Sequence, residues 1–249
     1  MVFKIKTFLK IFGLELLVIF FYTVNGAYAT ITAPTNPFFQ YIGLLPLALG
    51  VYFYLLKTNK WGNYLSLDNL KPLKEMTLLC SPLLLILAIL FIGNGGIDTS
   101  SISHLFLVLG TQILIVAFIE EIFYRGFMLN ILISKGFRFA VLTSSVLFGL
   151  THSLQLLGGQ SLEQTILQIM YAFFTGLVLS LLIVNKQSIL VTIIFHGLNN
   201  SFIMLKQTDG PPIYLYLIVG ILIVYAAILW MKASKAENTV LNKINNLSF

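Results

Sequence analysis

The chain has 249 residues, of which 58% are hydrophobic and 10% are charged, with a net charge of +6 and a mean hydropathy of +0.93. A soluble domain is about half apolar and a quarter charged, so this composition excludes a soluble enzyme, a secreted module, a disordered chain and a coiled coil. The basic residues lie mainly between apolar segments and form no dense patch, which excludes nucleic acid as a partner. We expect one all-α, polytopic integral membrane domain spanning residues 1–249.

Eight apolar segments are long enough, or nearly so, to cross a bilayer, which takes about 20 residues in a helix. They do not alternate as the strands of a membrane barrel would, so we expect about eight transmembrane helices in contact with lipid. In chain order the expected spans are Phe8–Ile31, Phe38–Leu56, Met76–Ile92, Leu105–Ser134, Phe139–Leu157, Gln164–Val184, Ile189–Leu205 and Ile213–Met231.

The first span has two interpretations. It follows Lys4, Lys6 and Lys10 and ends near Ala27–Ala29, a pattern that resembles a signal peptide with its cleavage site. Glu15 interrupts the apolar run, however, and the run is long for a signal. We therefore favour an uncleaved first helix, with Glu15 near the cytoplasmic interface.

Two further segments are polar. Lys57–Glu75 mixes aromatic and leucine residues with four lysines, which suits either a short amphipathic piece on an anionic leaflet or an ordinary basic loop. The tail at residues 232–249 carries several asparagines, and we expect it to be frayed and cytoplasmic.

The loop charges predict the orientation in the membrane. With a cytoplasmic N-terminus, 13 of the 15 Lys and Arg residues fall on the cytoplasmic side; Lys206 alone falls on the other side, and Arg125 lies within a span. Because cytoplasmic loops are enriched in basic residues, we expect a multi-pass protein of the cell membrane with both termini in the cytoplasm.

Ionisable residues inside membrane spans are costly, about 2.5–3.5 kcal/mol each on insertion scales, and therefore mark functional sites. Here they cluster on three spans within a core of about residues 105–205. The fourth span carries Glu120, Glu121 and Arg125, the fifth carries His152, and the seventh carries His196 together with Asn200.

Helical geometry separates the two glutamates. Glu121 and Arg125 are four residues apart and can form an ion pair on one face. Glu120 points about 100° away, at 3.6 residues per turn, and stays available for chemistry. Phe148 shares a face with His152, and His196 shares one with Asn200.

This set of side chains suits hydrolysis. Glu120 can take a proton from a water that His152 holds, and His196 with Asn200 can donate hydrogen bonds to an oxyanion. A zinc site made of Glu120, His152 and His196 is an alternative. We favour a site without metal or other cofactor, because it also gives Asn200, a poor zinc ligand, a role.

Two other interpretations need no hydrolysis. The same residues can form a buried polar network that fixes helix packing. They can also form a proton relay in a transporter or channel. Transporters typically contain internal repeats and broken helices in both halves, and the sequence shows neither sign.

Three motifs in order, Glu120-Glu121-x-x-x-Arg125, Phe148-x-x-x-His152 and His196-x-x-x-Asn200, resemble those of the CAAX-protease and bacteriocin-processing (CPBP or Abi) family of intramembrane endopeptidases. The resemblance covers residues 120–200. It implies an all-helical core and cleavage of a membrane-associated peptide or protein. It also implies that Glu120, His152, His196 and Asn200 are catalytic, with Glu121, Arg125 and Phe148 supporting them. A non-catalytic bacteriocin immunity or regulatory protein of the same fold is the alternative.

Overall fold

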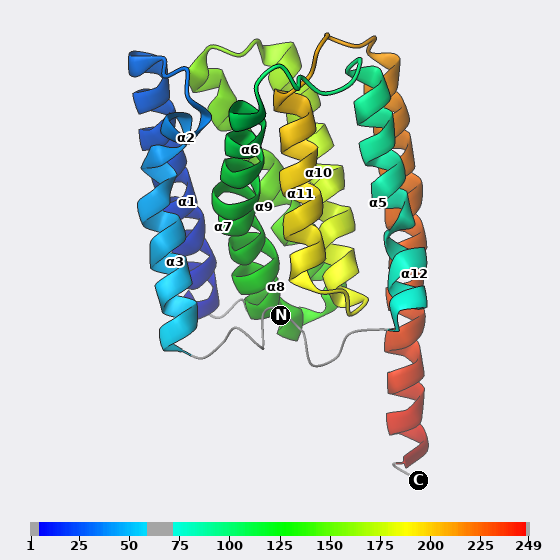
Figure 1. Cartoon of the computed structure of the whole chain (residues 1–249). Coiled ribbons are helices and arrows are strands. Elements are labelled where there is room, and N and C mark those ends of the chain that lie inside the picture. Colours follow the sequence, from blue (N-terminus) through cyan, green and yellow to red (C-terminus); the bar gives the residue numbers. More distant parts are fainter. Residues whose placement is uncertain (1–4, 59–71, 248–249) are drawn as a thin grey trace.

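The computed structural model describes residues 5–58 and 72–247 (Figure 1). Within these ranges every regular element is a helix, and the only extended pairing is an isolated bridge between Ile97 and Lys206. The helices run up and down in one bundle, and the described chain begins and ends at the lower end of Figure 1. The expected all-α fold is confirmed.

Six described helices are long and apolar enough to cross a membrane, and two shorter apolar helices, Ile42–Lys57 and Ile189–Met204, accompany them. Large apolar side chains cover the outside of the bundle; Phe20 is 60% exposed and Leu114 is 70% exposed. Such a surface is stable in lipid and not in water. The chain is therefore a multi-pass membrane protein, with the long helices at Ile5–Thr32, Lys74–Gly93, Ile102–Lys135, Phe137–Gly158, Leu162–Val184 and Ile213–Thr239.

The second expected span is not one helix. After α1 (Ile5–Thr32), the chain forms α2 (Pro37–Gln40), a 3-10 turn at Ile42–Leu44 and then α3 (Leu45–Lys57). The continuous helix predicted over Phe38–Leu56 is therefore wrong at its beginning.

A polar side chain from α1 holds this break. Asn25 Nδ2 donates to the carbonyl oxygen of Gln40 at 3.0 Å, and Asn25 Oδ1 accepts from the backbone N–H of Gly43 at 3.0 Å. A Cβ atom on Gly43 would lie 2.8 Å from Asn25 Oδ1. The break thus depends on a residue from another span, which the local sequence does not reveal.

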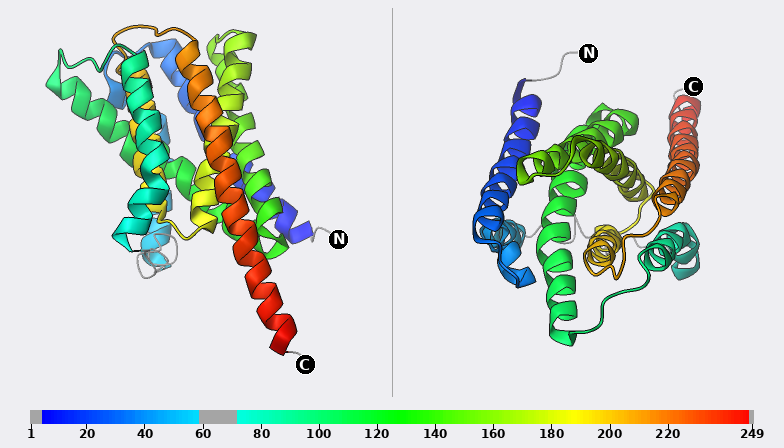
Figure 2. Two further views of the ribbon diagram at one scale, coloured as in Figure 1. Left: turned by 90° about the vertical axis from the view of Figure 1, so that its right-hand side faces the viewer. Right: turned by 90° about the horizontal axis from the view of Figure 1, so that it is seen from above.

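The long helix Ile102–Lys135 lies between α1–α3 and α11 (Figure 2). Two π-helical segments interrupt it, one on each side of the short helix α7 that carries the two glutamates. Helices of this kind are rare and often occur at functional sites. In order the segments are α6 (Ile102–Thr111), π-helix Gln112–Ala117, α7 (Phe118–Glu121), π-helix Ile122–Met128, α8 (Leu129–Leu132) and a 3-10 turn at Ile133–Lys135.

Close helix contacts place the elements that bear the two histidines. A Cβ on Gly149 would lie 3.1 Å from the carbonyl oxygen of Ile169, so α9 packs tightly on α10. A Cβ on Gly197 would lie 2.8 Å from the Cα of Ile113, which brings α11 against the first π-helical segment. The elements concerned are α9 (Phe137–Thr151), a 3-10 segment at His152–Gly158, α10 (Leu162–Val184) and α11 (Ile189–Met204).

The two remaining long helices, α5 (Leu73–Gly93) and α12 (Ile213–Leu247), pack against each other at one side of the bundle (Figure 1). The frayed tail predicted after Met231 is wrong, since α12 continues to Leu247. Residues 232–247 contain Lys, Ala, Glu and Leu and lack Gly and Pro, a composition that favours a helix. The amphipathic segment considered within Lys57–Glu75 falls mostly on residues 59–71, outside the described residues.

Candidate active site

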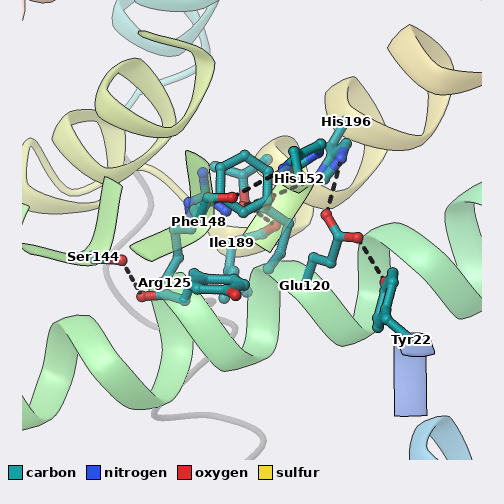
Figure 3. A network of polar contacts seen from close by, with 11 residues as sticks. Tyr22, Glu120, Arg125, Ser144, Phe148, His152, Ile189 and His196 are labelled. Atoms are coloured by element: carbon teal, nitrogen blue, oxygen red, sulfur yellow. Dashed lines mark hydrogen bonds and ion pairs between the residues drawn. The ribbon is translucent and has the colours of Figure 1, made fainter. Parts of the chain in front are cut away.

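The two carboxylate oxygens of Glu120 have different surroundings (Figure 3). Oε1 accepts a hydrogen bond from the hydroxyl of Tyr22 on α1 at 2.6 Å. Oε2 is buried, has no hydrogen-bond partner among the described residues, and lies 3.5 Å from Nε2 of His196. That distance exceeds the usual 2.7–3.2 Å of an N–H···O hydrogen bond. One oxygen is therefore fixed by α1, and the other is available to a reacting group.

Glu121 contacts two buried side chains and has a structural role. Its Oε1 accepts from Nη1 of Arg125 at 3.0 Å, and Nδ1 of His196 lies 2.8 Å from the same oxygen. The ion pair expected from the four-residue spacing is present, while the contact with His196 was not foreseen. Because an ionised carboxylate only accepts, Nδ1 of His196 carries a hydrogen and its Nε2 faces Glu120.

The Phe148 ring contacts the Arg125 guanidinium as well as the rings of both histidines. The guanidinium carbon of Arg125 lies 4.2 Å from the centre of the Phe148 ring, a cation–π contact. The rings of His152 and His196 pack edge-to-face on Phe148, with centroid distances of 5.0 Å and 5.7 Å. A Cβ on Gly176 would lie 2.9 Å from Phe148 Cδ1, so α10 closes this cluster from behind.

His152 lies where α9 ends and the tighter 3-10 segment begins. Its Nδ1 is 2.9 Å from the backbone carbonyl oxygen of Phe148. A carbonyl only accepts, so Nδ1 donates, and Nε2 of a neutral His152 holds a lone pair. His152 and Glu120 line the same cavity. His152 can therefore accept a hydrogen bond from a water beside Glu120.

Asn200 contacts a residue that the sequence did not single out. Its Nδ2 donates to Oε1 of Gln112 at 3.2 Å. Gln112 lies in the first π-helical segment, is 1% exposed, and its Nε2 has no hydrogen-bond partner among the described residues. The neighbouring Asn199 instead accepts from the hydroxyl of Tyr171 at 2.5 Å, which supports a packing role for it.

The first helix supplies a second polar contact near the site. Glu15 Oε1 accepts from the hydroxyl of Thr151 at 2.7 Å and lies 3.5 Å from the hydroxyl of Tyr124. Glu15 is half-buried and contacts α9 through Thr151, a contact that the predicted position near the cytoplasmic interface did not include. Glu15 and Tyr22 are seven residues apart, about two helical turns, and this spacing was the available sign that both face inward.

A cavity of about 830 Å³ gives access to these groups. Glu120, Phe148, His152 and Asn200 line it, together with the unforeseen Tyr22 and Gln112. Glu121, Arg125 and His196 are buried outside its lining. His196 thus lies behind Glu120, bonded toward both glutamates, which differs from the oxyanion position that the sequence suggested for it.

A metal ion binds where several ligand side chains lie close enough to coordinate it together. Both histidines have Nδ1 engaged, and Nε2 of His196 lies 3.5 Å from Glu120 Oε2; an engaged Nδ1 is also found at metal-binding histidines. Among residues 5–58 and 72–247, however, no three His, Cys, Asp or Glu side chains are grouped closely enough to hold one ion. This arrangement does not match the three-ligand zinc site considered from the sequence.

Comparisons with known proteins agree with the motif pattern. Residues 102–202 match the family described as type II CAAX prenyl endopeptidase, Rce1-like. This range includes all three motifs and excludes α1, which supplies Tyr22 and Glu15. A comparison of the chain with curated proteins found no match. Residues 102–202 are therefore similar to the Rce1-like family of type II CAAX prenyl endopeptidases.

Proposed function

We propose that the protein is an intramembrane endopeptidase that hydrolyses a peptide bond of a membrane-associated peptide or protein with a water activated by Glu120. The observation that carries this proposal is the state of Glu120. One of its oxygens is held by Tyr22, while the other is buried, unpartnered and faces His196 beside a large cavity. A buried carboxylate placed in this way is suited to take a proton from water.

The chemistry follows from the residues that line the cavity. Glu120 Oε2 accepts a proton from the water, whose second hydrogen is held by Nε2 of His152. The water oxygen bonds to the carbonyl carbon, and the carbonyl oxygen becomes an oxyanion. Asn200 Nδ2, whose second hydrogen is not used by Gln112, donates to that oxyanion. Glu120 then gives its proton to the amide nitrogen, the C–N bond breaks, and a carboxylic acid and an amine are released.

His196 is placed to control the charge of Glu120. With Nδ1 donating to Glu121, Nε2 of a neutral His196 would present a lone pair to Oε2 of Glu120 at 3.5 Å. Such a pair is favourable only when a proton lies between the two atoms. One extra proton also balances the charges of Glu120, Glu121 and Arg125, which favours it in a buried site. We propose that His196 holds this proton and so stabilises the ionised form of Glu120, which then takes a proton from water.

The first helix belongs to the mature protein in this proposal. Cleavage after Ala29 would remove Tyr22 and Glu15, and with them the group that orients Glu120. The uncleaved first helix favoured from the sequence is therefore the form that completes the site.

The test uses purified protein in lipid vesicles and a pool of fluorescence-quenched decapeptides, with the reaction run in ¹⁸O-labelled water. We expect wild-type protein to cleave members of the pool and to place one ¹⁸O in each new carboxyl group. Glu120→Gln should lower the rate by about 10²–10⁴-fold, the range typical of general acid–base catalysis. The control is Glu163→Gln, a change at an exposed glutamate outside the site, which should keep the wild-type rate. A folded Glu120→Gln variant with wild-type activity would contradict the proposal.

A further inference from the structure

The cavity at Glu120 has a buried floor and an exposed mouth. Its buried lining residues include Gln112, Val116, Glu120 and Phe148, which lie in the interior of the bundle. The exposed lining residues begin in the second half of α1, with Thr23, Gly26 and Ala27, and continue to the helix ends. At those ends they include Thr30 and Ile31 of α1, Gln155, Leu157 and Gly158 after α9, and Ile203 of α11. All of these helix ends lie at the upper end of the bundle in Figure 1. The path to Glu120 therefore begins at the upper end.

That end is opposite the beginning and the end of the described chain, which both lie at the lower end (Figure 1). The described basic residues gather at the same end. Lys6 and Lys10 begin α1, Lys57 ends α3, Lys74 begins α5, Lys135 and Arg138 flank the turn between α8 and α9, Lys186 lies between α10 and α11, and Lys232, Lys235 and Lys243 lie toward the end of α12. Lys206, in the loop after α11, is the only one assigned to the upper side, where its ammonium pairs with Asp209. By the positive-inside rule the lower end is cytoplasmic, so the mouth of the cavity faces away from the cytoplasm.

The lining indicates what can enter. Among the described residues that line the cavity there is no Lys, Arg or Asp, and Glu120 is the only carboxylate. A charged segment would lose its hydration there without gaining a partner, which disfavours its entry. Amide groups of Asn25, Gln155 and Gln168 lie among apolar side chains. The volume of about 830 Å³ falls in the range of about 300–1,000 Å³ of ligand sites.

Gln112 adds a specific contact for a peptide backbone. Its Nε2 is a buried donor with no partner among the described residues, and its side chain lines the cavity next to Asn200. An unpartnered buried donor is unfavourable, and a peptide carbonyl oxygen in the cavity would satisfy it. A backbone amide next to the scissile bond is the group that these two side chains fit.

We propose that the substrate is an uncharged stretch of polypeptide that reaches Glu120 from the non-cytoplasmic side of the membrane, with its backbone carbonyl held by Gln112. This proposal rests on the proposed hydrolysis at Glu120. It assigns the protein to cleavage of exported or outward-facing membrane-anchored peptides, and not to cleavage of polypeptides presented from the cytoplasm.

Access is tested without any substrate. Cys80, the only cysteine, is changed to Ser, and single cysteines are introduced as Gln155→Cys at the mouth and Ser134→Cys at the opposite end, both at exposed positions. Intact cells are treated with a membrane-impermeant maleimide. We expect Gln155→Cys to be labelled in intact cells and Ser134→Cys only after the membrane is permeabilised. Any other labelling pattern would overturn the assignment of the mouth to the non-cytoplasmic side.

Substrate class is tested with purified protein. Quenched decapeptides without charged residues should be cleaved at least tenfold faster than matched peptides that carry a Lys at every third position. Gly26→Trp should slow cleavage at least fivefold, because Gly26 lines the cavity and nothing lies within 4 Å of its added Cβ. The control is Gly220→Trp, at an exposed glycine of α12 that also has nothing within 4 Å. Equal rates for charged and uncharged peptides, or for the two tryptophan variants, would overturn the proposal.

The role of Gln112 has its own readout. Gln112→Met keeps the size of the side chain and removes both the donor and the oxygen that accepts from Asn200, and we expect it to raise KM at least fivefold for uncharged peptides. Gln112→Met with wild-type KM would overturn the backbone contact. If wild-type protein cleaves none of the peptides, the proposed hydrolysis fails, whereas the labelling pattern still decides which side the cavity faces.

Discussion

The buried pair of Glu121 and Arg125 offers the sharpest stability prediction. Both side chains are 0% exposed, and Oε1 of Glu121 is the only hydrogen-bond acceptor that the described residues give to the guanidinium. Replacing one partner of a buried ion pair costs about 3–5 kcal/mol, because the other charge is left without compensation. Glu121→Gln should therefore destabilise the folded protein by about that amount, and Arg125→Met should do the same.

The melting temperature of the purified protein measures this effect. For a chain of 150–250 residues, about 1 kcal/mol shifts the melting temperature by about 2–4 °C, so each single variant should melt about 6–20 °C lower. The melting temperature of the double variant should fall by much less than the sum of the two single shifts, since replacing both charges of a buried pair is often close to neutral. The control is Glu237→Gln, which removes an exposed pair with Arg138 at 3.7 Å and should shift the melting temperature by no more than about 4 °C, because exposed pairs contribute about 1 kcal/mol or less.

A Glu121→Gln variant that melts with the wild-type protein would refute the structural role of this carboxylate. Strictly additive shifts in the double variant would refute the direct coupling of the two side chains. Because Glu121 also accepts from His196, the same variant should lose activity even at temperatures where it is folded. The stability effect and the activity effect are thus measured on one protein sample.

Three further predictions concern other parts of the site. Tyr22→Phe should lower the hydrolysis rate about tenfold, equivalent to about 1.4 kcal/mol, with little change in melting temperature, because it removes only the hydrogen bond that orients Glu120; an unchanged rate would exclude that role. Phe148→Ala should destabilise the protein by about 3–5 kcal/mol and Phe148→Leu by clearly less, measured by thermal unfolding, since the ring packs against both histidines and Arg125; equal losses would contradict this packing role. Reporter fusions within residues 93–100 and after residue 247 should report opposite sides of the membrane, with the C-terminus cytoplasmic, and a shared side would overturn the orientation.

Much of the fold could be predicted because apolar length alone determines which segments can span a bilayer. The eight expected segments correspond to the apolar helices of the structure, although the second is broken. That break depends on Asn25, a residue 15 positions before its partner Gln40 and on a different helix. Hydropathy averages over a window cannot detect a single side-chain contact of this kind.

The site was predictable where a motif lies on one helix and not where it lies between helices. The pairing of Glu121 with Arg125 followed from their spacing and is present at 3.0 Å. The π-helical segments on both sides of α7 alter the direction of side chains, and composition gives no sign of them. Tyr22 and Gln112 contact Glu120 and Asn200 across helix interfaces, so their roles became visible only in three dimensions.

The most direct test of a glutamate-activated water compares the hydrolysis rates of wild-type protein and Glu120→Gln after exhaustive chelation, with the metal content measured in the same samples. Chelated, metal-free wild-type protein should retain its full rate, and chelated Glu120→Gln should be at least about 100-fold slower while melting with the wild type. Loss of the wild-type rate on chelation that stoichiometric zinc alone restores, or a Glu120→Gln variant as fast as the wild type, would contradict the mechanism.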